Sequence, residues 1–416
     1  MNIGKRPRII FNEAKVPEYD LPDPLTCLDG TKVSNKKIWS NKRRSEILKL
    51  FNENVYGKMP GRTGKFAFEI KLIKKNALAG KATLKEITIS LENNNKTIKL
   101  NVLIFLPNSQ KKPYPTLVGL NFHGNYAINQ DPDIRLPDQW VPNDNEYNIT
   151  ENKAIEFARG MRASKWSAEL VIERGYALAT IYNGDIDPDF DDDFKNGVHP
   201  LFYKGDQLRP REDEWGTIGA WAWGLSRVMD YFEYDNDIDH ERVLVLGHSR
   251  LGKVALWAGA NDQRFAIVVS NNSGCGGAAL FRRKFGETIY YLNKYFPHWF
   301  CNNFKYYNER ESELPIDQHM LISLIAPRPV YIASAERDFW SDPKGEFLAA
   351  KYANSVYKLL GTDGFNATKM PKLNQPIMST IGFHIRPGDH DLTKYDLERY
   401  IDFADIHFKN SHKIHG

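Results

Sequence analysis

The stretch from Glu241 to Ala260, ERVLVLGHSRLGKVALWAGA, constrains the fold more than any other part of the chain. It contains an apolar run, Val243 to Leu246, which is typical of a buried parallel strand. A short turn then leads into helix-forming residues from Val254 to Ala260. Such a strand, turn and helix would place Ser249 on a sharp bend with its hydroxyl exposed, although a serine here also suits a plain helix N-cap.

The turn fits the Gly-x-Ser-x-Gly pattern of an exposed nucleophilic serine only in part. Gly247 and Ser249 match, but Leu251 stands where the second glycine belongs and glycine follows one place later, at Gly252. The pattern alone does not decide whether Ser249 reacts, so the partners must be sought elsewhere in the chain.

Composition indicates an ordinary globular protein. Of the 416 residues, 42% are hydrophobic and 26% are charged, and the net charge of +4 is not concentrated in a basic block, which argues against nucleic-acid binding. No run of 18 apolar residues suggests a membrane span, and the start, Met1 to Arg6, lacks the apolar core of a signal peptide. Cys27, Cys275 and Cys301 allow at most one disulfide and show no zinc-binding spacing.

The hydrophobic period changes along the chain. Residues 1–60 are expected to form an arm and one helix, whose apolar stripe includes Ile47 and Phe51. From Phe66 to Leu106 the period becomes two, and Asn93 to Asn95 supplies a hairpin turn, so this part is predicted as an antiparallel meander.

Continuous apolar strands separated by helical segments follow the meander. An amphipathic helix is expected from Ile218 to Phe232. Strands are expected at Thr116 to Phe122, Tyr176 to Ile181, Val243 to Leu246, Phe265 to Ser270, Pro329 to Ala335 and Ser379 to Ile385. This order predicts an α/β fold of the α/β-hydrolase type, with a mostly parallel central sheet, antiparallel N-terminal strands and helices on both faces. We expect one catalytic domain over 1–416, with insertions near 125–165 and 281–315 over the active-site face.

Candidate partners for Ser249 follow later strands in the order that this fold requires. A serine nucleophile needs a base, and the base needs an acid that fixes its tautomer. Asp338 comes after the strand that ends at Ala335, and His390 comes after the strand that ends near Ile385. Other residues on the same segments remain rivals: Glu336 and Asp342 for the acid, and His384 for the base.

Several motifs together resemble one enzyme family. They are Gly247-His248-Ser249-Arg250-Leu251-Gly252-Lys253, Ser273-Gly274-Cys275-Gly276-Gly277-Ala278, Arg282-Arg283-Lys284-Phe285-Gly286-Glu287, Asp338-Phe339-Trp340-Ser341-Asp342-Pro343, Gly382-Phe383-His384-Ile385-Arg386-Pro387-Gly388-Asp389-His390-Asp391, Tyr19-Asp20-Leu21-Pro22-Asp23-Pro24 and Gly119-Leu120-Asn121-Phe122-His123-Gly124-Asn125. The chain is similar over nearly its whole length to the glucuronoyl esterases of carbohydrate esterase family fifteen, and most of all to the bacterial members.

The resemblance implies hydrolysis of the ester that joins 4-O-methyl-glucuronic acid of glucuronoxylan to a lignin alcohol. It implies that Ser249 is the nucleophile, His390 the base and Arg250 an oxyanion stabiliser through its guanidinium and backbone amide. The sugar-binding residues implied are Lys253, Glu287 and Trp340. Taken alone, these three have other readings: a solvated lysine, a glutamate paired with Arg282 or Arg283, and a core tryptophan. No cofactor and no metal is implied.

One position departs from the family pattern. Many relatives place a glutamate just before the Ser273-Gly274 pair, where this chain has Asn272, and asparagine cannot supply a charge to an imidazolium. Other bacterial relatives use an aspartate after the later strand, and Asp338 matches that position. We therefore predict Asp338 as the acid of the triad.

An acidic run, Asp185 to Asp193, raises the question of a calcium site. It lacks the glycine and terminal glutamate of an EF-hand loop and contains a proline, so the sequence favours a solvated loop without metal.

Two other functions remain open on sequence. The first is a different carbohydrate esterase, of the acetyl-xylan or feruloyl type, and the second is a non-catalytic hydrolase fold that binds polysaccharide. The expected partner is a glucuronoxylan or lignin-carbohydrate ester, with no nucleic acid and no membrane. The protein is expected to be a monomer, secreted or periplasmic, with any signal peptide removed before this sequence begins.

Overall fold

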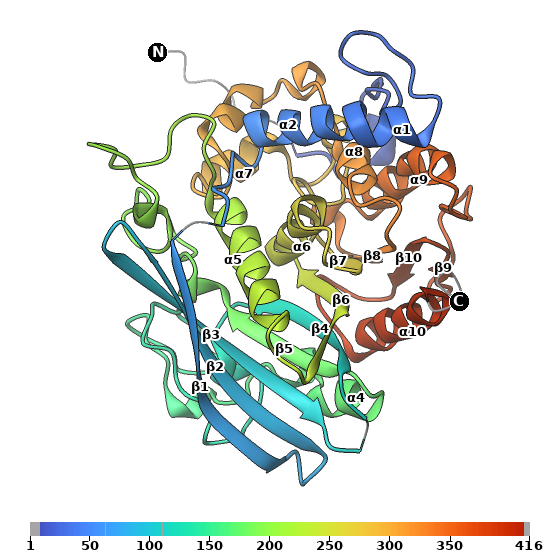
Figure 1. Cartoon of the computed structure of the whole chain (residues 1–416). Helices are drawn as coiled ribbons and strands as arrows, with labels where there is room; N and C mark the ends of the chain where they lie inside the picture. The colour runs from blue at the N-terminus through green and yellow to red at the C-terminus, as the bar shows by residue number, and fades with distance from the viewer. Residues whose placement is uncertain (1–8, 63, 110, 412–416) are drawn as a thin grey trace.

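A computed structural model describes residues 9–62, 64–109 and 111–411, so Met1 to Arg6 lie outside the described part. One ten-stranded sheet runs through the molecule in the order β1-β2-β3-β5-β4-β6-β7-β8-β10-β9 (Figure 1). The strands are β1 (Lys65–Ala77), β2 (Ala82–Asn93), β3 (Lys96–Pro107), β4 (Tyr114–Asn121), β5 (Ala177–Tyr182), β6 (Ile238–His248), β7 (Ile267–Asn271), β8 (Val330–Ala335), β9 (Ile377–Met378) and β10 (Ile381–Arg386).

The first three strands form the predicted antiparallel meander. β1 pairs with β2 and β2 pairs with β3 along their lengths. The hairpin between β2 and β3 turns at Asn94 and Asn95, whose φ values of 51° and 58° lie in the left-handed region that asparagine tolerates well. β3 then joins the rest of the sheet by antiparallel pairing with β5.

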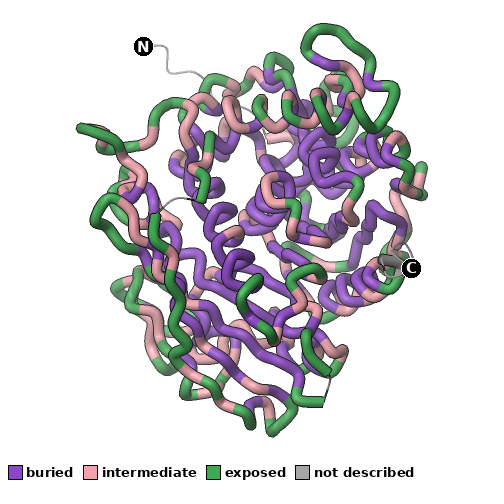
Figure 2. Tube along the Cα trace, viewed as in Figure 1, coloured by how far each residue is buried: buried purple, intermediate pink, exposed green. Residues whose placement is uncertain are grey.

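The central strands β5, β4, β6, β7, β8 and β10 run parallel to one another. Alternate residues of β6 point to opposite faces: Val243 and Val245 join one hydrophobic core, whereas Leu244 and Leu246 join the other. Each face is therefore covered, and Figure 2 shows the central strands and the helices beside them as mostly buried, whereas the edge strand β1 is largely exposed. This confirms the predicted α/β-hydrolase architecture.

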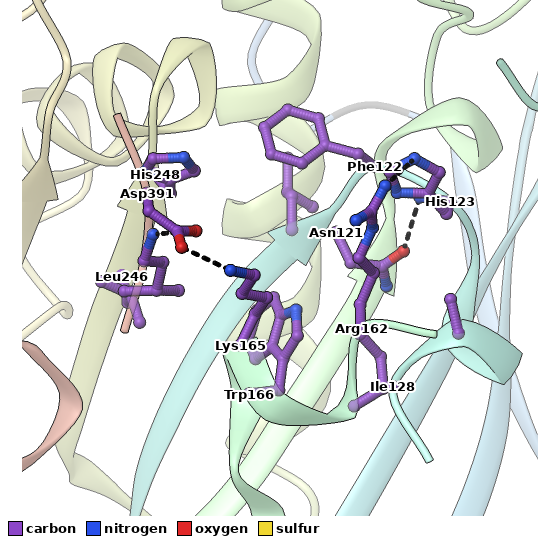
Figure 3. A pocket seen from close by; sticks show the side chains of 13 residues that line it. Asn121, Phe122, His123, Ile128, Arg162, Lys165, Trp166, Leu246, His248 and Asp391 are labelled. Carbon is purple, nitrogen blue, oxygen red and sulfur yellow. Dashed lines mark hydrogen bonds and ion pairs between the residues drawn. The ribbon is translucent and has the colours of Figure 1, made fainter. Parts of the chain in front are cut away.

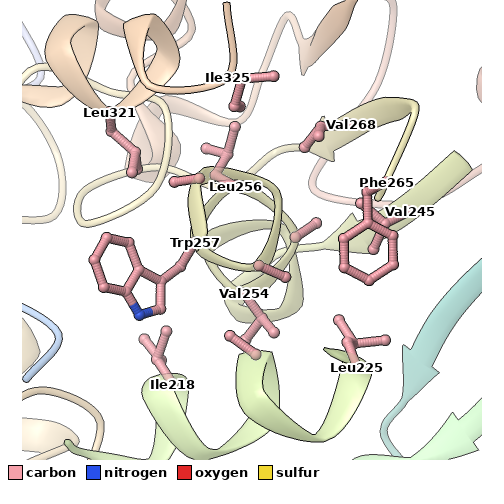
Figure 4. Close-up of a cluster of buried hydrophobic side chains, with 14 of the residues drawn as sticks. Ile218, Leu225, Val245, Val254, Leu256, Trp257, Phe265, Val268, Leu321 and Ile325 are labelled. Carbon is pink, nitrogen blue, oxygen red and sulfur yellow. The ribbon is translucent and has the colours of Figure 1, made fainter. Parts of the chain in front are cut away.

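Helices cover both faces. α5 (Thr217–Phe232), α6 (Arg250–Asn261), α8 (Gln318–Ser323) and α9 (Pro343–Leu359) contribute to the first core. Figure 4 shows Trp257 and Val254 of α6 facing Ile218 of α5, with Leu321 of α8 close by. The second core is covered by α3 (Ala163–Trp166), α4 (Ala168–Glu173) and α10 (Lys394–Ser411).

The N-terminal part contains η1 (Glu13–Lys15), α1 (Lys36–Ile38), η2 (Trp39–Arg43) and α2 (Arg44–Asn54). Ile47 and Phe51 of α2 are fully buried, as their apolar stripe predicts. Arg44 anchors the helix by donating to the carbonyls of Leu324 and Ala260. The arm and helix are thereby fixed to the helical layer on one face of the sheet.

Short helical turns fill the two segments that were expected as insertions. Residues 125–165 include η3 (Asn125–Ala127), η4 (Glu156–Ala158) and most of α3, and residues 281–315 include η7 (Phe281–Arg283), α7 (Ile289–Tyr295), η8 (Asn302–Tyr307) and η9 (Glu311–Glu313). Between β5 and α5 lie η5 (Asn183–Asp185) and η6 (His199–Leu201), and after β8 lies η10 (Phe339–Ser341). Among the described residues, no helix is both long and apolar enough to cross a bilayer.

Candidate active site

The turn between β6 and α6 bends sharply at Ser249. Its φ of 58° and ψ of −130° are unusual for a residue with a side chain, and such strain is concentrated at functional sites. Helix α6 begins at Arg250, directly after the serine and earlier than the sequence predicts, so the amide of Arg250 lies at the helix N-terminus beside the hydroxyl.

Two glycines make this turn possible. A Cβ at Gly247 would lie 1.8 Å from the carbonyl oxygen of Leu251, and a Cβ at Gly252 would lie 2.9 Å from Cβ of Ser273. The second glycine is therefore needed at 252, where α6 passes close to the loop after β7, and not at 251. This explains why the motif departs from the usual spacing.

The predicted acid and base meet above the carboxyl ends of β8 and β10. His390 Nδ1 lies 2.7 Å from Asp338 Oδ2, and Asp338 is 4% exposed. Burial alone would raise the pKa of Asp338, but the hydrogen bond and charge of His390 outweigh it and hold the pKa below its ordinary value. An ionised carboxylate thus fixes the ring of His390 through Nδ1, which is the orientation that the predicted role of His390 as a base requires.

Asn272 supports this acid instead of replacing it. Its Nδ2 donates to Asp338 Oδ2 over 2.7 Å, so the position where many relatives carry glutamate here supplies a neutral hydrogen bond. The φ of 48° at Asn272 also lies in the left-handed region, which asparagine adopts more readily than most residues.

The rival residues lie away from this pair: Glu336 at the surface, and Asp342 and His384 with other partners. Glu336 is exposed, and its backbone nitrogen pairs with Arg386. Asp342 caps α9 and accepts from Arg283 Nε over 2.7 Å. His384 is fully buried, and its Nε2 lies 2.8 Å from Asp396 Oδ1. Among the described residues, His390 Nδ1 instead has Asp338 Oδ2 and, at 3.5 Å, Ser341 Oγ as its side-chain partners.

His248, which precedes the nucleophile candidate, packs against the base. The ring centroids of His248 and His390 are 4.7 Å apart, and His248 Nδ1 lies 2.6 Å from Asn271 Oδ1. Burial, together with the neighbouring His390, lowers the pKa of His248 to about 3. A neutral His248 can therefore pack beside His390 without placing a positive charge next to it.

Arg250 is held in place by an acid that sequence reasoning missed. Arg250 Nη1 donates to Asp189 Oδ2 over 2.6 Å, and its guanidinium lies 5.0 to 5.7 Å from the ring centroids of Trp299, Phe122 and Phe296. The other oxygen of Asp189 accepts from Trp299 Nε1 over 2.8 Å and lies 3.3 Å from His298 Nε2. Burial opposes ionisation of Asp189, but His298, Arg250 and Trp299 together lower its pKa.

The acidic run is consequently not the solvated loop that the sequence suggested. Asp185 and Asp187 are 4% and 2% exposed, and Asp187 accepts from Thr217 Oγ1 and from the ring of His199. Only the later part of the run, from Asp191, is at the surface. The sequence does not reveal this burial because the hydrogen-bond donors to Asp185 and Asp187, such as Asn101 and Thr217, come from distant segments.

We expect Asp189→Asn to lower kcat by about tenfold to a hundredfold, because the guanidinium of Arg250 loses the charge that orients it. KM should change little, since Asp189 contacts Arg250 and not the residues that are predicted to bind sugar. Steady-state kinetics test this, with Asp191→Asn as the control at an exposed position of the same run. Unchanged kcat in Asp189→Asn would contradict the role.

The three predicted sugar-binding residues form one chain of contacts. Lys253 is 3% exposed, and its Nζ donates to the carbonyls of Ser273 and Cys275 and lies 3.1 Å from Glu287 Oε2. The other oxygen of Glu287 accepts from Trp340 Nε1 over 3.1 Å, and Trp340 is 38% exposed. The buried lysine, whose three donors are all used, thus holds the half-buried carboxylate of Glu287 behind the accessible indole, so that Glu287 and Trp340 are the members of this chain of contacts open to a sugar.

The alternative readings of these residues do not hold in the structure. Arg282 pairs with Asp317 and Arg283 with Asp342, so Glu287 is left to Lys253. Lys253 is buried and not solvated, and Trp340 is partly exposed and not part of the core.

Glu346 is a second residue that the sequence did not reveal. It lies fully buried on α9, where its Oε1 accepts from the amides of Ser273 and Gly274 over 2.8 and 2.9 Å and its Oε2 accepts from Ser334 Oγ. It therefore fixes the loop after β7, which carries Asn272 and the carbonyls that bind Lys253. Only the fold brings this glutamate to that loop.

Glu346→Ala should lower the free energy of unfolding by about 2 to 4 kcal/mol, because two buried amides lose their acceptor. Glu346→Gln keeps one acceptor oxygen and should cost less. Denaturant unfolding of both variants measures the difference. If Glu346→Gln lowers the free energy of unfolding as much as Glu346→Ala does, the role of Glu346 as a hydrogen-bond acceptor is contradicted.

Neither a metal-binding cluster nor a disulfide is found among the described residues. No group of three or more His, Cys, Asp or Glu side chains there is placed to hold a metal ion. The three cysteines are buried as free thiols.

Comparison with known proteins points to one family. Residues 162–361 match the family model described as glucuronyl esterase, fungi. Carbohydrate esterase MZ0003, from an unknown prokaryotic organism, is 53% identical over 398 residues, which are 95% of this chain and 91% of that protein. A solved glucuronoyl esterase from Solibacter usitatus is 47% identical with a TM-score of 0.89, covering 95% of this chain and 99% of that one. A CE15 esterase from a marine bacterial metagenome is 52% identical with a TM-score of 0.90, covering 96% and 100%.

A serine on a strand-to-helix turn, with a base and its acid on loops after later strands, is the arrangement of the α/β-hydrolase class. Within that class, the identities above show that the chain belongs to carbohydrate esterase family fifteen, the glucuronoyl esterases, and is of the bacterial type.

Proposed function

We propose that the protein hydrolyses the ester between 4-O-methyl-glucuronic acid of glucuronoxylan and a lignin alcohol, with Ser249 as nucleophile. The observation that carries this proposal is the placement of Lys253 on the first turns of α6, so that the buried lysine, Glu287 and Trp340 lie beside the nucleophile turn. A relative from Cerrena unicolor named 4-O-methyl-glucuronoyl methylesterase is 26% identical over 367 residues, which are 83% of this chain and 64% of that protein.

The proposed reaction has two steps. Ser249 Oγ bonds to the uronoyl carbon while its proton passes to His390, and the oxyanion is stabilised by the Arg250 amide and guanidinium. The bond from that carbon to the alcohol oxygen then breaks, and His390 returns the proton to the alcohol. In the second step His390 deprotonates water, whose oxygen bonds to the uronoyl carbon. The bond from that carbon to Ser249 Oγ then breaks, and His390 returns the proton to Oγ, which releases glucuronic acid and the free serine.

The charge of Arg250 suits this chemistry. A cation at the first residue of a helix is disfavoured by the helix dipole, and here an acid from another segment and three aromatic rings hold it there. A guanidinium fixed in this way needs little reorganisation when negative charge develops on the carbonyl oxygen.

Substrate preference tests the proposal. We expect hydrolysis of benzyl glucuronate to exceed that of acetylated xylan and of feruloyl esters, because the sugar-binding residues recognise the acid part of the ester. Glu287→Gln should raise KM for benzyl glucuronate by about tenfold, as one charged hydrogen bond to the sugar is lost. Glu336→Gln, at an exposed position, is the matched control. A preference for acetyl or feruloyl groups would overturn the uronate assignment, and binding of glucuronoxylan without turnover would favour the non-catalytic alternative.

We further propose that the protein works as a monomer outside the cytoplasm. The residues of the proposed mechanism all come from one chain, so a partner subunit is not needed to complete the site. A polymeric, lignin-linked substrate lies outside the cell, which requires secretion or export to the periplasm.

A further inference from the structure

A cavity of about 210 Å³ lies beside the proposed catalytic centre, at the carboxyl ends of β4 and β6. Figure 3 shows its side chains around an open space, with the ring of Phe122 along one side and Lys165 reaching towards Asp391. Most of the wall is apolar. Its apolar members are Leu120, Phe122, Ala127, Ile128, Trp166, Leu246 and Leu392.

Two side chains of the cavity wall also contact the proposed reacting groups. Phe122 lines the cavity and also lies 5.3 Å from the Arg250 guanidinium. His248 lines it and packs against His390. Asp391, which follows His390 directly, forms part of the rim. The space therefore adjoins both the proton carrier and the oxyanion cation.

The sheet order places the cavity and the sugar-binding residues on opposite sides of the nucleophile. Strand β6 lies between β4 and β7, and β8 follows β7. Glu287 and Trp340 come from segments after β7 and β8, and they meet Lys253 there. The cavity instead lies on the β4 side, where its wall includes Phe122 and Ile128.

We propose that this cavity receives the alcohol part of the ester, in the form of a neutral arylalkyl alcohol. This inference rests on the proposed function. When the uronic acid occupies the Lys253 side, the alcohol must project to the other side of the ester carbon, because the two groups are bonded to the same carboxyl. His390 returns its proton to the alcohol oxygen as the carbon–oxygen bond breaks, so the leaving alcohol forms next to the residues that line the cavity.

The size and polarity of the cavity select this class of alcohol. An apolar cavity of about 150 Å³ is large enough for benzene, so about 210 Å³ accommodates one ring with a short chain. The charges at the rim are already paired: Lys165 with Asp391 over 2.5 Å and Arg162 with Asp144 over 3.0 Å. Burial, with a smaller contribution from Arg162, lowers the pKa of His123 to about 4, so this wall residue is neutral at ordinary pH. An uncharged aromatic guest suits this lining better than an ionic group or a sugar.

A series of glucuronate esters that differ only in the alcohol tests the proposal. The methyl, benzyl and 3-phenylpropyl esters are compared by kcat/KM in the unmodified protein and in two variants of Ile128. Ile128→Phe should lower the benzyl-to-methyl ratio by about tenfold, because the added ring occupies the cavity. Ile128→Ala should raise the ratio of the 3-phenylpropyl ester to the benzyl ester. Ile134→Phe, the same change at a buried residue of the same segment outside the cavity wall, should leave both ratios unaltered.

The outcomes separate this proposal from the proposed function. If all esters are hydrolysed and neither Ile128 variant changes the ratios, the cavity does not receive the alcohol. If the unmodified protein hydrolyses none of the esters, the proposed function fails and the cavity proposal falls with it. Should Ile128→Phe not fold, the alanine variant still tests the proposal. Product inhibition of the unmodified protein gives a second test, in which 3-phenyl-1-propanol should inhibit more strongly than methanol. Equal inhibition by the two alcohols would overturn the proposal.

Discussion

Ser249→Ala should lower kcat for benzyl glucuronate by at least about 10⁴-fold, the largest effect expected of any single change in this chain. The substitution removes the atom that bonds to the uronoyl carbon, and no other group can form the acyl-enzyme. The Arg250 cation and the sugar-binding residues remain, so some activity above that of water should survive. Steady-state kinetics with high enzyme concentration measure the residual rate.

The fold should tolerate this substitution. Alanine carries the same Cβ as serine and meets the same cost at a φ of 58°, so the turn is strained equally in both proteins. The midpoint of thermal unfolding serves as the control, and calorimetry should show that glucuronoxylan fragments still bind. Activity equal to that of the unmodified protein would exclude Ser249 as the nucleophile.

Asp338→Ala should lower kcat by about 10³- to 10⁴-fold, because His390 loses the carboxylate that fixes its tautomer and stabilises its positive form. Asn272→Ala removes only a neutral hydrogen bond to Asp338 Oδ2 and should cost about tenfold or less. Kinetics of the two variants under the same conditions give the ranking. A larger loss in Asn272→Ala than in Asp338→Ala would show that His390 depends on the residue after β7 and not on Asp338.

The pH dependence of activity also tests the assignment of Asp338 and His390. Because the pKa of Asp338 lies below its ordinary value of 3.8, the carboxylate is ionised at every pH above about 4. Loss of activity on acidification above that pH must therefore come from a group other than Asp338. The lowered pKa of Asp338 also adds to the free energy of unfolding. This contribution is fully present above the pKa of the carboxyl in the unfolded chain, and it is lost as the pH falls through the pKa in the folded protein.

Much of this arrangement follows from the sequence because it depends on local pattern and chain order. The alternation in β1 to β3, the apolar run in β6 and the order Ser249, Asp338, His390 are all readable along the chain. The structure places Asp338 within hydrogen-bond reach of His390, and it joins Lys253 to Glu287, a contact that the sequence interpretation did not include.

Two residues could not be predicted because their roles arise only from long-range contacts. Asp189 lies in an acidic run whose composition indicates solvent exposure, yet Arg250, His298 and Trp299 surround it in the fold. Glu346 reads as an ordinary helical glutamate, and only the packing of α9 against the loop after β7 gives it four hydrogen-bond donors. Charge partners far apart in sequence leave no periodic signal.

The displaced glycine of the nucleophile motif illustrates the same limit. The sequence shows that Gly252 is out of place, but not why. The reason is the approach of α6 to Ser273, which leaves no room for a Cβ at 252. The same loop supplies a carbonyl to Lys253, so close packing at Gly252 and placement of the lysine are parts of one contact.

Trapping of the acyl-enzyme tests the central claim most directly. The protein is mixed with benzyl glucuronate, quenched in acid within milliseconds, digested and analysed by mass spectrometry. We predict a glucuronoyl adduct on the peptide that contains Ser249, and its absence in Ser249→Ala. An adduct on another residue, or the same adduct in the alanine variant, would contradict the assignment of Ser249 as the nucleophile.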